Sequence, residues 1–149
     1  MEMKFPTYDL TGRRALVTGA GSGIGRAAAL CLAHYGAQVA VCDIQMERAK
    51  SVTDEILSAG GQAVAVQGNV ADAQSVADMF AQVDEAFGGL DILISNAGVG
   101  GDVKPILEQS EEAFDQVVSV DLKGAFLCAK QAAQRMIGQG QGGRMIFTA

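Results

Sequence analysis

The sequence is poor in aromatic residues, proline and histidine, and it has no long apolar run. Its 149 residues contain no tryptophan, two prolines and a single histidine, and 5% of them are aromatic. The longest uninterrupted apolar run covers residues 27–33, whereas a helix that crosses a bilayer needs about 20 apolar residues. We therefore expect no membrane-spanning segment.

Basic residues are also scarce. Eleven Lys and Arg stand against 17 Asp and Glu, which gives a formal net charge of -6. This balance disfavours a nucleic-acid or anionic-membrane partner bound through a generally basic surface, but it is compatible with a local anion site. Residues 1–6 include an acid and a proline and lead to no apolar core of signal-peptide length. We therefore expect a cytoplasmic protein.

The cysteines are few and do not form a metal or redox motif. Cys31, Cys42 and Cys128 are an odd number without a Cys-x-x-Cys pair, and each lies in an apolar periodic segment. Free cysteine is among the most buried residue types. We expect three buried, reduced thiols and no metal site.

What the sequence does contain is an alternation of short apolar runs and longer segments of helical period. The runs predict strands at 14–18, 38–42, 62–67, 90–94 and 144–148, with four helices between them. Strands joined by helices are parallel when the crossovers are right-handed. The chain is therefore predicted to be one α/β domain, residues 1–149, with a doubly wound parallel sheet.

The same periodicity predicts the buried face of each helix. Asp72 and Ser110 are placed to cap the third and fourth helices. The first helix is expected to bury Ile24, Ala27, Ala28, Cys31 and Tyr35; the second Met46, Ala49, Val52, Ile56 and Leu57; the third Val76, Met79, Phe80, Val83 and Phe87; and the long fourth Phe114, Val117, Val118, Leu122, Phe126, Ala129, Ala133 and Ile137.

The most informative stretch is the turn at residues 18–25, between the first strand and the first helix. It is built from Gly19, Gly21, Ser22, Gly23, Ile24 and Gly25. Glycines leave no Cβ in the way, so a pyrophosphate can approach the backbone N–H groups at the positive end of a helix. A tight strand-to-helix connection can also use several glycines, and the position after a strand favours the phosphate interpretation.

Asp43 adds a second element to this site. It follows the second strand, 20 residues beyond Gly23, where a carboxylate can accept hydrogen bonds from the adenosine ribose. It could instead cap the next helix. A carboxylate there repels a 2′-phosphate, and Ser22 and Ile44 are uncharged, so NAD is predicted over NADP; Arg48 is expected to be solvated.

Four segments resemble the short-chain dehydrogenase/reductase family over residues 10–149. The spacing Gly19-x-x-x-Gly23-x-Gly25 is similar to the family's cofactor turn. Residues 95–98, Ser-Asn-Ala-Gly, resemble its Asn-Asn-Ala-Gly segment, and residues 69–70, Asn-Val, its Asp-Val. Residues 120–124, Val-Asp-Leu-Lys-Gly, resemble its Val-Asn-Leu-x-Gly.

The resemblance implies a Rossmann-like sheet of order 3-2-1-4-5 and NAD-dependent hydride transfer that interconverts a secondary alcohol and a ketone, both small molecules, in a protein that forms a homo-oligomer when complete. It implies a place at or near the cofactor for Asn69, Val70, Asn96, Ala97 and Gly98. An Asn69 carbonyl oxygen would accept from the adenine amino group, and Asn96 would hold the sheet. Asp121 stands at the position of the family's catalytic asparagine, whose backbone carbonyl positions a water.

The family's serine and Tyr-x-x-x-Lys are not found in this sequence. Its tyrosines, Tyr8 and Tyr35, are followed four residues later by Gly12 and Val39. Both tyrosines are expected to be structural, and His34 and Lys123 to be peripheral. The family's serine follows the fifth strand, so the C-terminal strands and helices of the family are expected to be missing and this chain alone to be inactive.

Two other interpretations stay open. The chain could be a nucleotide-binding fragment without catalysis, because the serine and the Tyr-Lys pair are absent. A methyltransferase can also combine a glycine turn with an acid after the second strand, although Val17 and Thr18 offer no carboxylate before Gly19. The substrate, the reaction direction and the oligomeric state are not predicted from the sequence.

Overall fold

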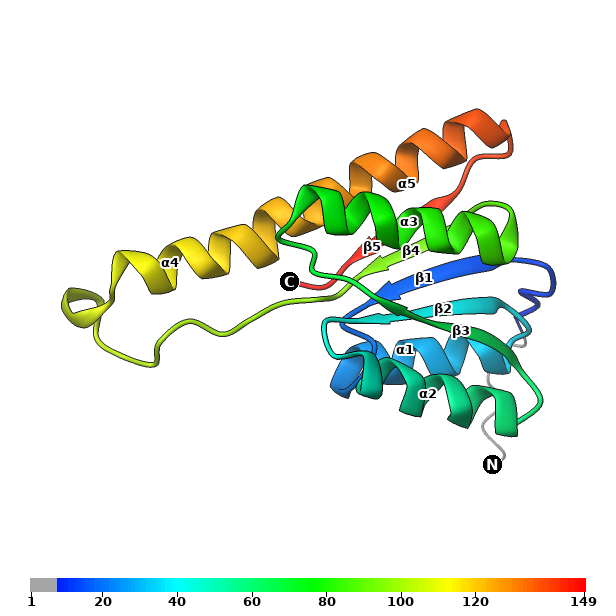
Figure 1. Ribbon diagram of the computed structural model, residues 1–149, viewed down its shortest axis with the longest axis horizontal. Helices are drawn as coiled ribbons and strands as arrows, with labels where there is room; N and C mark the ends of the chain where they lie inside the picture. The colour runs from blue at the N-terminus through cyan, green and yellow to red at the C-terminus, as the bar shows by residue number, and fades with distance from the viewer. Residues whose placement is uncertain (1–7) are drawn as a thin grey trace, which may run out of the picture.

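The computed structural model describes residues 8–149 as a parallel sheet with helices on both faces (Figure 1). Its strands are β1 (Arg14–Thr18), β2 (Gln38–Asp43), β3 (Gln62–Gln67), β4 (Ile92–Ser95) and β5 (Arg144–Phe147). They are ordered β3-β2-β1-β4-β5, and every pair is parallel. The predicted α/β class and strand order are therefore confirmed.

The helices form a layer on each side of this sheet. They are α1 (Gly23–His34), α2 (Met46–Ser58), α3 (Ala73–Phe87), α4 (Glu111–Val117) and α5 (Ala125–Gln139), with a 3₁₀ turn η1 (Ile106–Glu108) and a π-helical segment η2 (Val118–Gly124). Figure 1 shows α1 and α2 on one face and α3 and α5 on the other. Within residues 8–149, no helix has both the length and the hydropathy to cross a membrane.

Two cores follow from the period of two in the strands, because successive side chains point to opposite faces of a sheet. In β1, Leu16 belongs to the core beneath α3 and α5. Its neighbours Ala15 and Val17 belong to the core beneath α1 and α2. The strands are continuous apolar runs in the sequence because helices cover both faces of the sheet.

The two predicted helix caps are present. Asp72 Oδ1 accepts a hydrogen bond from the backbone N–H of Ser75 at 2.6 Å, and Ser110 Oγ accepts one from Ala113 at 3.1 Å. Each satisfies a backbone donor that has no partner within its helix. These caps fix the residues at which α3 and α4 begin.

The buried face predicted for α1 was wrong in part. Ile24 and Cys31 are exposed, and the buried residues of this helix are Gly25 and Ala29. A stripe of small residues lets α1 lie close to the sheet, and Ile24 and Cys31 lie outside this contact. On α2, Leu57 is likewise exposed, whereas Ile56 beside it is buried.

The buried face predicted for the α4–α5 helix was also wrong. Phe114, Leu122, Phe126 and Ile137 are 66%, 68%, 62% and 79% exposed, and we call these four residues the outer stripe. Against the sheet and α3, α5 buries Cys128, Ala132 and Met136. The helix has two apolar stripes. The periodicity of the sequence predicted that the stripe with the larger side chains is buried, whereas the stripe with the smaller side chains packs in the core.

Strand β5 lies at the edge of the sheet, where it pairs with β4 alone. Its Met145, Ile146 and Phe147 are exposed. In residues 8–149, β5 and the outer stripe of the α4–α5 helix each present exposed apolar side chains, as does the loop segment at Val103, Ile106 and Leu107.

Candidate functional site

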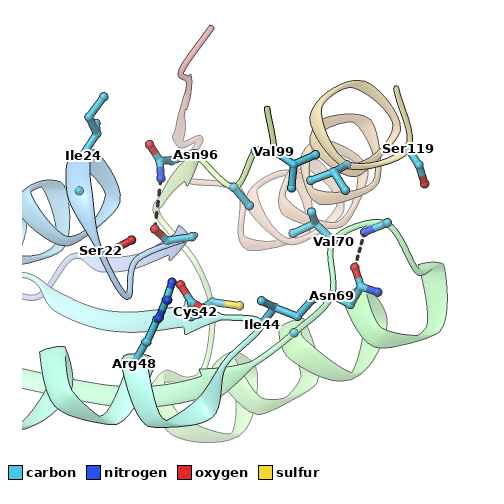
Figure 2. A pocket seen from close by; sticks show the side chains of 18 of the residues that line it. Ser22, Ile24, Cys42, Ile44, Arg48, Asn69, Val70, Asn96, Val99 and Ser119 are labelled. Carbon is cyan, nitrogen blue, oxygen red and sulfur yellow. Dashed lines mark hydrogen bonds between the residues drawn. The ribbon is translucent and has the colours of Figure 1, made fainter. Parts of the chain in front are cut away.

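A cavity of about 620 Å³ opens at the carboxyl ends of the strands, which is the edge where parallel α/β sheets bind ligands. Its wall is built from the turn after β1, the end of β2, the loops after β3 and β4, and the helix around η2 (Figure 2). Ten predicted site residues line it: Gly19, Ser22, Gly23, Ile24, Asp43, Asn69, Val70, Asn96, Ala97 and Gly98.

Three predicted residues do not line this cavity. Gly21 and Gly25 belong to the glycine turn but pack against Asp43 and Gly19, and Asp121 contacts the loop after β4. The lining also includes residues that the sequence did not assign to the site, among them Arg48, Val99, Gln116, Ser119 and Val120. The η2 residues could have been found from their adjacency to Asp121, and Arg48 from its place in the first turn of α2.

The start of α1 presents free backbone donors to the cavity. Ser22 is the N-cap residue, but its side chain makes no capping hydrogen bond, so the first-turn N–H groups have no partner inside the helix. Gly23 has a φ of +53°, and a Cβ there would meet nothing within 4 Å. This combination of open space, unpaired donors and helix dipole fits a phosphate group.

Two other glycines of the turn, Gly19 and Gly25, are needed for close packing of the backbone. A Cβ on Gly25 would overlap the Gly19 carbonyl oxygen and lie 2.5 Å from Asn96 Nδ2. Gly19 has a φ of +62°, and a Cβ there would lie 2.8 Å from Ala97 Cα. These two glycines therefore let the turn and the start of α1 approach the end of β4.

Asp43 is fixed at the end of β2. Its side chain is 7% exposed, its Oδ2 accepts from the backbone N–H of Gly21 at 3.0 Å, and its Oδ1 accepts from that of Gln45 at 3.0 Å. A Cβ on Gly21 would lie 2.7 Å from Asp43 Oδ2 and 2.5 Å from Arg48 Cβ. Gly21 thus makes room for the carboxylate and for α2.

Asn69 uses its side-chain carbonyl locally. Its Oδ1 accepts a hydrogen bond of 3.1 Å from the backbone N–H of Ala71, and its own backbone N–H donates to Ser75 Oγ at 2.8 Å. Figure 2 shows Asn69 and Val70 at the side of the cavity opposite Ser22 and Ile24. The oxygen expected to accept from adenine therefore has one lone pair engaged already.

Asn96 joins three strands at the cavity floor. Its backbone N–H donates to Thr18 Oγ1 at 3.0 Å, and its Nδ2 donates to the carbonyl oxygens of Thr18 and Gly19 at 3.2 and 3.3 Å. Thr148 Oγ1 donates to Asn96 Oδ1 at 3.3 Å. These contacts connect the ends of β1, β4 and β5.

Asp121 connects the π-helical segment to the loop after β4. Its Oδ1 accepts a hydrogen bond of 2.9 Å from the backbone N–H of Val99. A Cβ on Gly98 would lie 3.4 Å from its Oδ2, so the carboxylate rests against Gly98. π-Helical turns leave backbone groups out of the regular ladder and are frequent at functional sites.

The possible acid–base residues lie away from the cavity. The rings of Tyr8 and Tyr35 pack edge to face with centroids 5.6 Å apart, and neither lines the cavity. His34 lies at the exposed end of α1 and Lys123 is exposed. Residues 8–149 contain no cluster of three His, Cys, Asp or Glu side chains that could hold a metal ion.

Cys42 lines the cavity but is not an activated nucleophile. Burial raises the pKa of its thiol far above the ordinary value, and its Sγ lies 3.0 Å from Met79 Sδ. Reactive cysteines need a lowered pKa. Among the described residues, the cavity therefore presents binding groups at the glycine turn and at the end of β2, and its Cys42 is not activated for covalent catalysis.

The sequence matches a family profile described as short chain dehydrogenase over residues 13–149. It is 43% identical over 137 residues to a short-chain dehydrogenase/reductase of Armillaria gallica, covering 91% of this chain and 52% of that protein. It is 40% identical over 138 residues to an L-rhamnose 1-dehydrogenase (NAD(P)(+)) of Sphingomonas, covering 92% of this chain and 54% of that one.

Solved structures show the same similarity. A short-chain type dehydrogenase/reductase from Mycobacterium marinum matches with a TM-score of 0.92 and 40% identity, over 96% of this chain and 57% of that one. A 3-ketoacyl-ACP reductase from Sinorhizobium meliloti matches with a TM-score of 0.87 and 37% identity, over 90% and 52%. The chain thus spans about half the length of the curated relatives it matches.

Proposed function

Because the chain belongs to the short-chain dehydrogenase/reductase family, we propose that it forms the cofactor site of an NAD-dependent oxidoreductase that interconverts a secondary alcohol and a ketone. One observation carries this proposal. The uncapped start of α1, with open space at Gly23, faces the same cavity as the fixed carboxylate of Asp43. Phosphate and ribose of a dinucleotide need this pair of features.

In this proposal each element of the cavity holds one part of the cofactor. The N–H groups at Ser22, Gly23 and Ile24 bind the pyrophosphate, and Asp43 accepts from the ribose hydroxyls. The backbone N–H of Val70 and the side chain of Asn69 face the adenine. Gly21 and Gly25 act indirectly, because they allow the turn to adopt this shape.

The preference for NAD over NADP is supported by the burial of Asp43. A carboxylate that is 7% exposed and hydrogen-bonded to two backbone N–H groups cannot move away from a ligand without losing those bonds. A 2′-phosphate beside it would meet like charge in a partly desolvated position. The hydroxyls of an unmodified ribose donate to it instead.

The reacting end of the cofactor would lie toward η2. Bound there, the nicotinamide ring would accept or donate the hydride. Asp121 holds the loop after β4 through Val99, and its backbone carbonyl is the group proposed to position a water of the proton relay.

The serine and the Tyr-x-x-x-Lys motif are not among these 149 residues, so residues 1–149 alone are expected to be inactive. Dinucleotide binding without catalysis is the alternative function.

A homo-oligomer is proposed from the outer stripe. Two copies whose α4–α5 helices pair antiparallel would cover these apolar side chains. Sedimentation should show that Phe126→Glu shifts the protein toward monomer, while Leu57→Glu on α2 does not; a monomeric parent protein would refute the pairing.

The function is tested by titrating NAD, NADP and S-adenosylmethionine into the protein and following the heat released. Saturable NAD binding that is weakened by Ser22→Pro, which changes the first helical turn, supports the proposal. Binding of S-adenosylmethionine in place of either dinucleotide would contradict it. The cytoplasmic location stays a prediction of the sequence.

A further inference from the structure

A second cavity, of about 550 Å³, lies at the edge of the sheet where β2 and β3 begin, opposite the edge that carries the dinucleotide site. Its wall is formed by the last turns of α1 and α2, which cover the same face of the sheet (Figure 1), and by the turns that follow these helices. Its volume is within the usual range for small-molecule sites. The two cavities have no lining residue in common, so this one is a separate candidate site.

The floor of the second cavity is apolar. Ile56 and Ala37 are buried there, and Leu30 and Ala33 of α1 line it beside them. A Cβ on Gly61 would lie 2.7 Å from Ile56 Cγ2 and 3.6 Å from Ala33 Cβ, so Gly61 lets the turn before β3 lie against both helices. This floor favours a ligand with a short hydrocarbon body.

The rim of the second cavity is electronegative, because two helices end at it. The C-terminus of a helix carries the partial negative charge of the dipole and favours a cation. His34 is the sole basic residue in the last turn of α1, and the last turn of α2 has none. The carbonyl oxygens of His34 and Ala59 accept no hydrogen bond from any residue in the range 8–149. Both residues line the cavity.

Glu55 adds a full negative charge to this rim. Among the described residues that line the second cavity, it is the one acidic side chain, and none of them is Lys or Arg. Arg26 Nη2 donates to both Glu55 carboxylate oxygens, at 2.6 and 2.7 Å, but Arg26 does not line the cavity. A carboxylate has about four lone-pair sites, so Glu55 can accept from a second donor.

We propose that the second cavity binds a primary alkylammonium ion. The three N–H donors of an ammonium group match the acceptors of the rim, which are the His34 and Ala59 carbonyls and the Glu55 carboxylate. The alkyl chain would cover the apolar floor around Ile56. An alcohol of the same size would gain the apolar contact without the charge interaction, and a carboxylate would be repelled by both helix ends.

The test uses butylammonium, butanol and butyrate, which are similar in size and differ in charge, with backbone amide NMR as the readout. Butylammonium should produce saturable shifts at the Ala37 and Gly61 amides, with a Kd on the order of 1 mM. Butanol should bind at least about fivefold more weakly, and butyrate should cause no saturable shift. The result does not depend on whether the first cavity binds NAD.

Two pairs of variants locate the binding. Ala59→Lys places a tethered ammonium group on the rim and should weaken butylammonium binding roughly tenfold or more, whereas Ser58→Lys adds the same charge at an exposed position outside the lining and should change it less than about twofold. Glu55→Gln should weaken binding roughly threefold, and Asp54→Asn, beside it and outside the lining, should have a smaller effect. Lysine is favourable at a helix C-terminus, so both lysine variants should fold; circular dichroism checks this.

Several results would overturn the proposal. Equal binding of butanol and butylammonium would show an apolar groove without charge selection, and tighter binding of butyrate would show the opposite charge preference. No saturable shift with butylammonium would exclude the site. Equal losses in Ala59→Lys and Ser58→Lys would show that the cation is attracted by the helix ends in general and is not held in the second cavity.

Discussion

Asp43 Oδ2 accepts a hydrogen bond of 3.0 Å from the backbone N–H of Gly21, so the end of β2 and the glycine turn after β1 form one unit. The carboxylate that would bind a ribose also fixes the backbone that would bind a pyrophosphate. Gly21 has no side chain where these two parts meet. A change at Asp43 is therefore expected to affect both halves of the proposed site.

Replacing Asp43 by Ala should weaken NAD binding by roughly tenfold or more, because the ribose hydroxyls lose a charged acceptor. NADP should lose less or gain, since a like charge beside its 2′-phosphate disappears. Isothermal titration measures both affinities. Asp54→Ala removes the same charge from the exposed surface of α2 and should change neither; an unchanged NAD-to-NADP ratio in Asp43→Ala would contradict the assignment.

Replacing Gly25 by Ala should lower the free energy of unfolding by roughly 1–3 kcal/mol through overpacking. The added methyl group would overlap the Gly19 carbonyl and approach Asn96 Nδ2. Gly138→Ala is the matched control, because a Cβ there meets nothing within 4 Å in α5 and should be neutral or stabilising. Urea denaturation measures both; equal stability of the two variants would show that the turn tolerates a side chain.

Much of this site was predictable because it depends on local backbone requirements. The residues at 14–34 directly predict a strand, a glycine turn and a helix N-terminus, and Asp43 lies at the end of β2, where the sequence places it. Arg48 was not predicted as a site residue, because its contact with Gly21 joins two separate crossovers and has no periodicity. Asp121 was predicted from the resemblance, but its contact with the loop after β4, outside the cavity lining, was not, because that contact also joins segments distant in the sequence.

The helix faces were predicted less well than the helices themselves. Periodicity shows that a helix has an apolar stripe, but the α4–α5 helix has two. Which stripe packs against the sheet depends on how closely the backbones of the helix and the sheet approach each other. Here Ala132 and Cys128 fit into the contact, whereas Phe126 does not. The large exposed side chains are therefore a property of the packing and not of the local sequence.

Asp121 can be tested through the amide that it holds. Asp121→Ala removes the acceptor for the Val99 N–H and should speed hydrogen exchange at that amide, while Asp121→Asn keeps a carbonyl oxygen in place and should not. In the active enzyme, Asp121→Ala should lower kcat by up to roughly 100-fold through misplacement of the reacting groups. Slow exchange at Val99 in Asp121→Ala would refute the positioning role.

The three thiols should differ in reactivity. Cys31 is exposed, whereas Cys42 and Cys128 are buried, and burial raises the pKa of Cys128 to about 12 and that of Cys42 further. A thiol-specific disulfide reagent should therefore label Cys31 in the native protein and all three cysteines after unfolding. Native Cys31→Ser should remain unlabelled; rapid labelling of that variant would show that a second thiol is accessible.

Stability should depend on pH through Asp91. Its Oδ2 accepts from Arg14 Nε at 2.8 Å and its Oδ1 from Nη2 at 2.9 Å, and these bonds hold the pKa of Asp91 below its ordinary value of 3.8. A carboxyl whose folded pKa is lowered stabilises the protein above its unfolded pKa, and this contribution is lost as pH falls through the folded pKa.

Asp91→Asn should therefore cost roughly 2 kcal/mol of unfolding free energy at pH 7, and its difference from the parent should shrink below about pH 4. Denaturant titrations across this range measure it. Asp54→Asn, at an exposed position on α2, is the control. A difference between Asp91→Asn and the parent that stays constant down to pH 2 would contradict the ion-pair explanation.

The central claim is tested most directly by recording backbone amide NMR spectra of the protein during a titration with NAD. The account predicts saturable shifts at Ser22, Gly23 and Ile24, together with the amides of Gly21 and Gln45 that donate to Asp43. Saturable shifts confined to the second cavity, lined by Leu30 and His34 of α1 and by Glu55 of α2, or no shifts at saturating NAD, would contradict it.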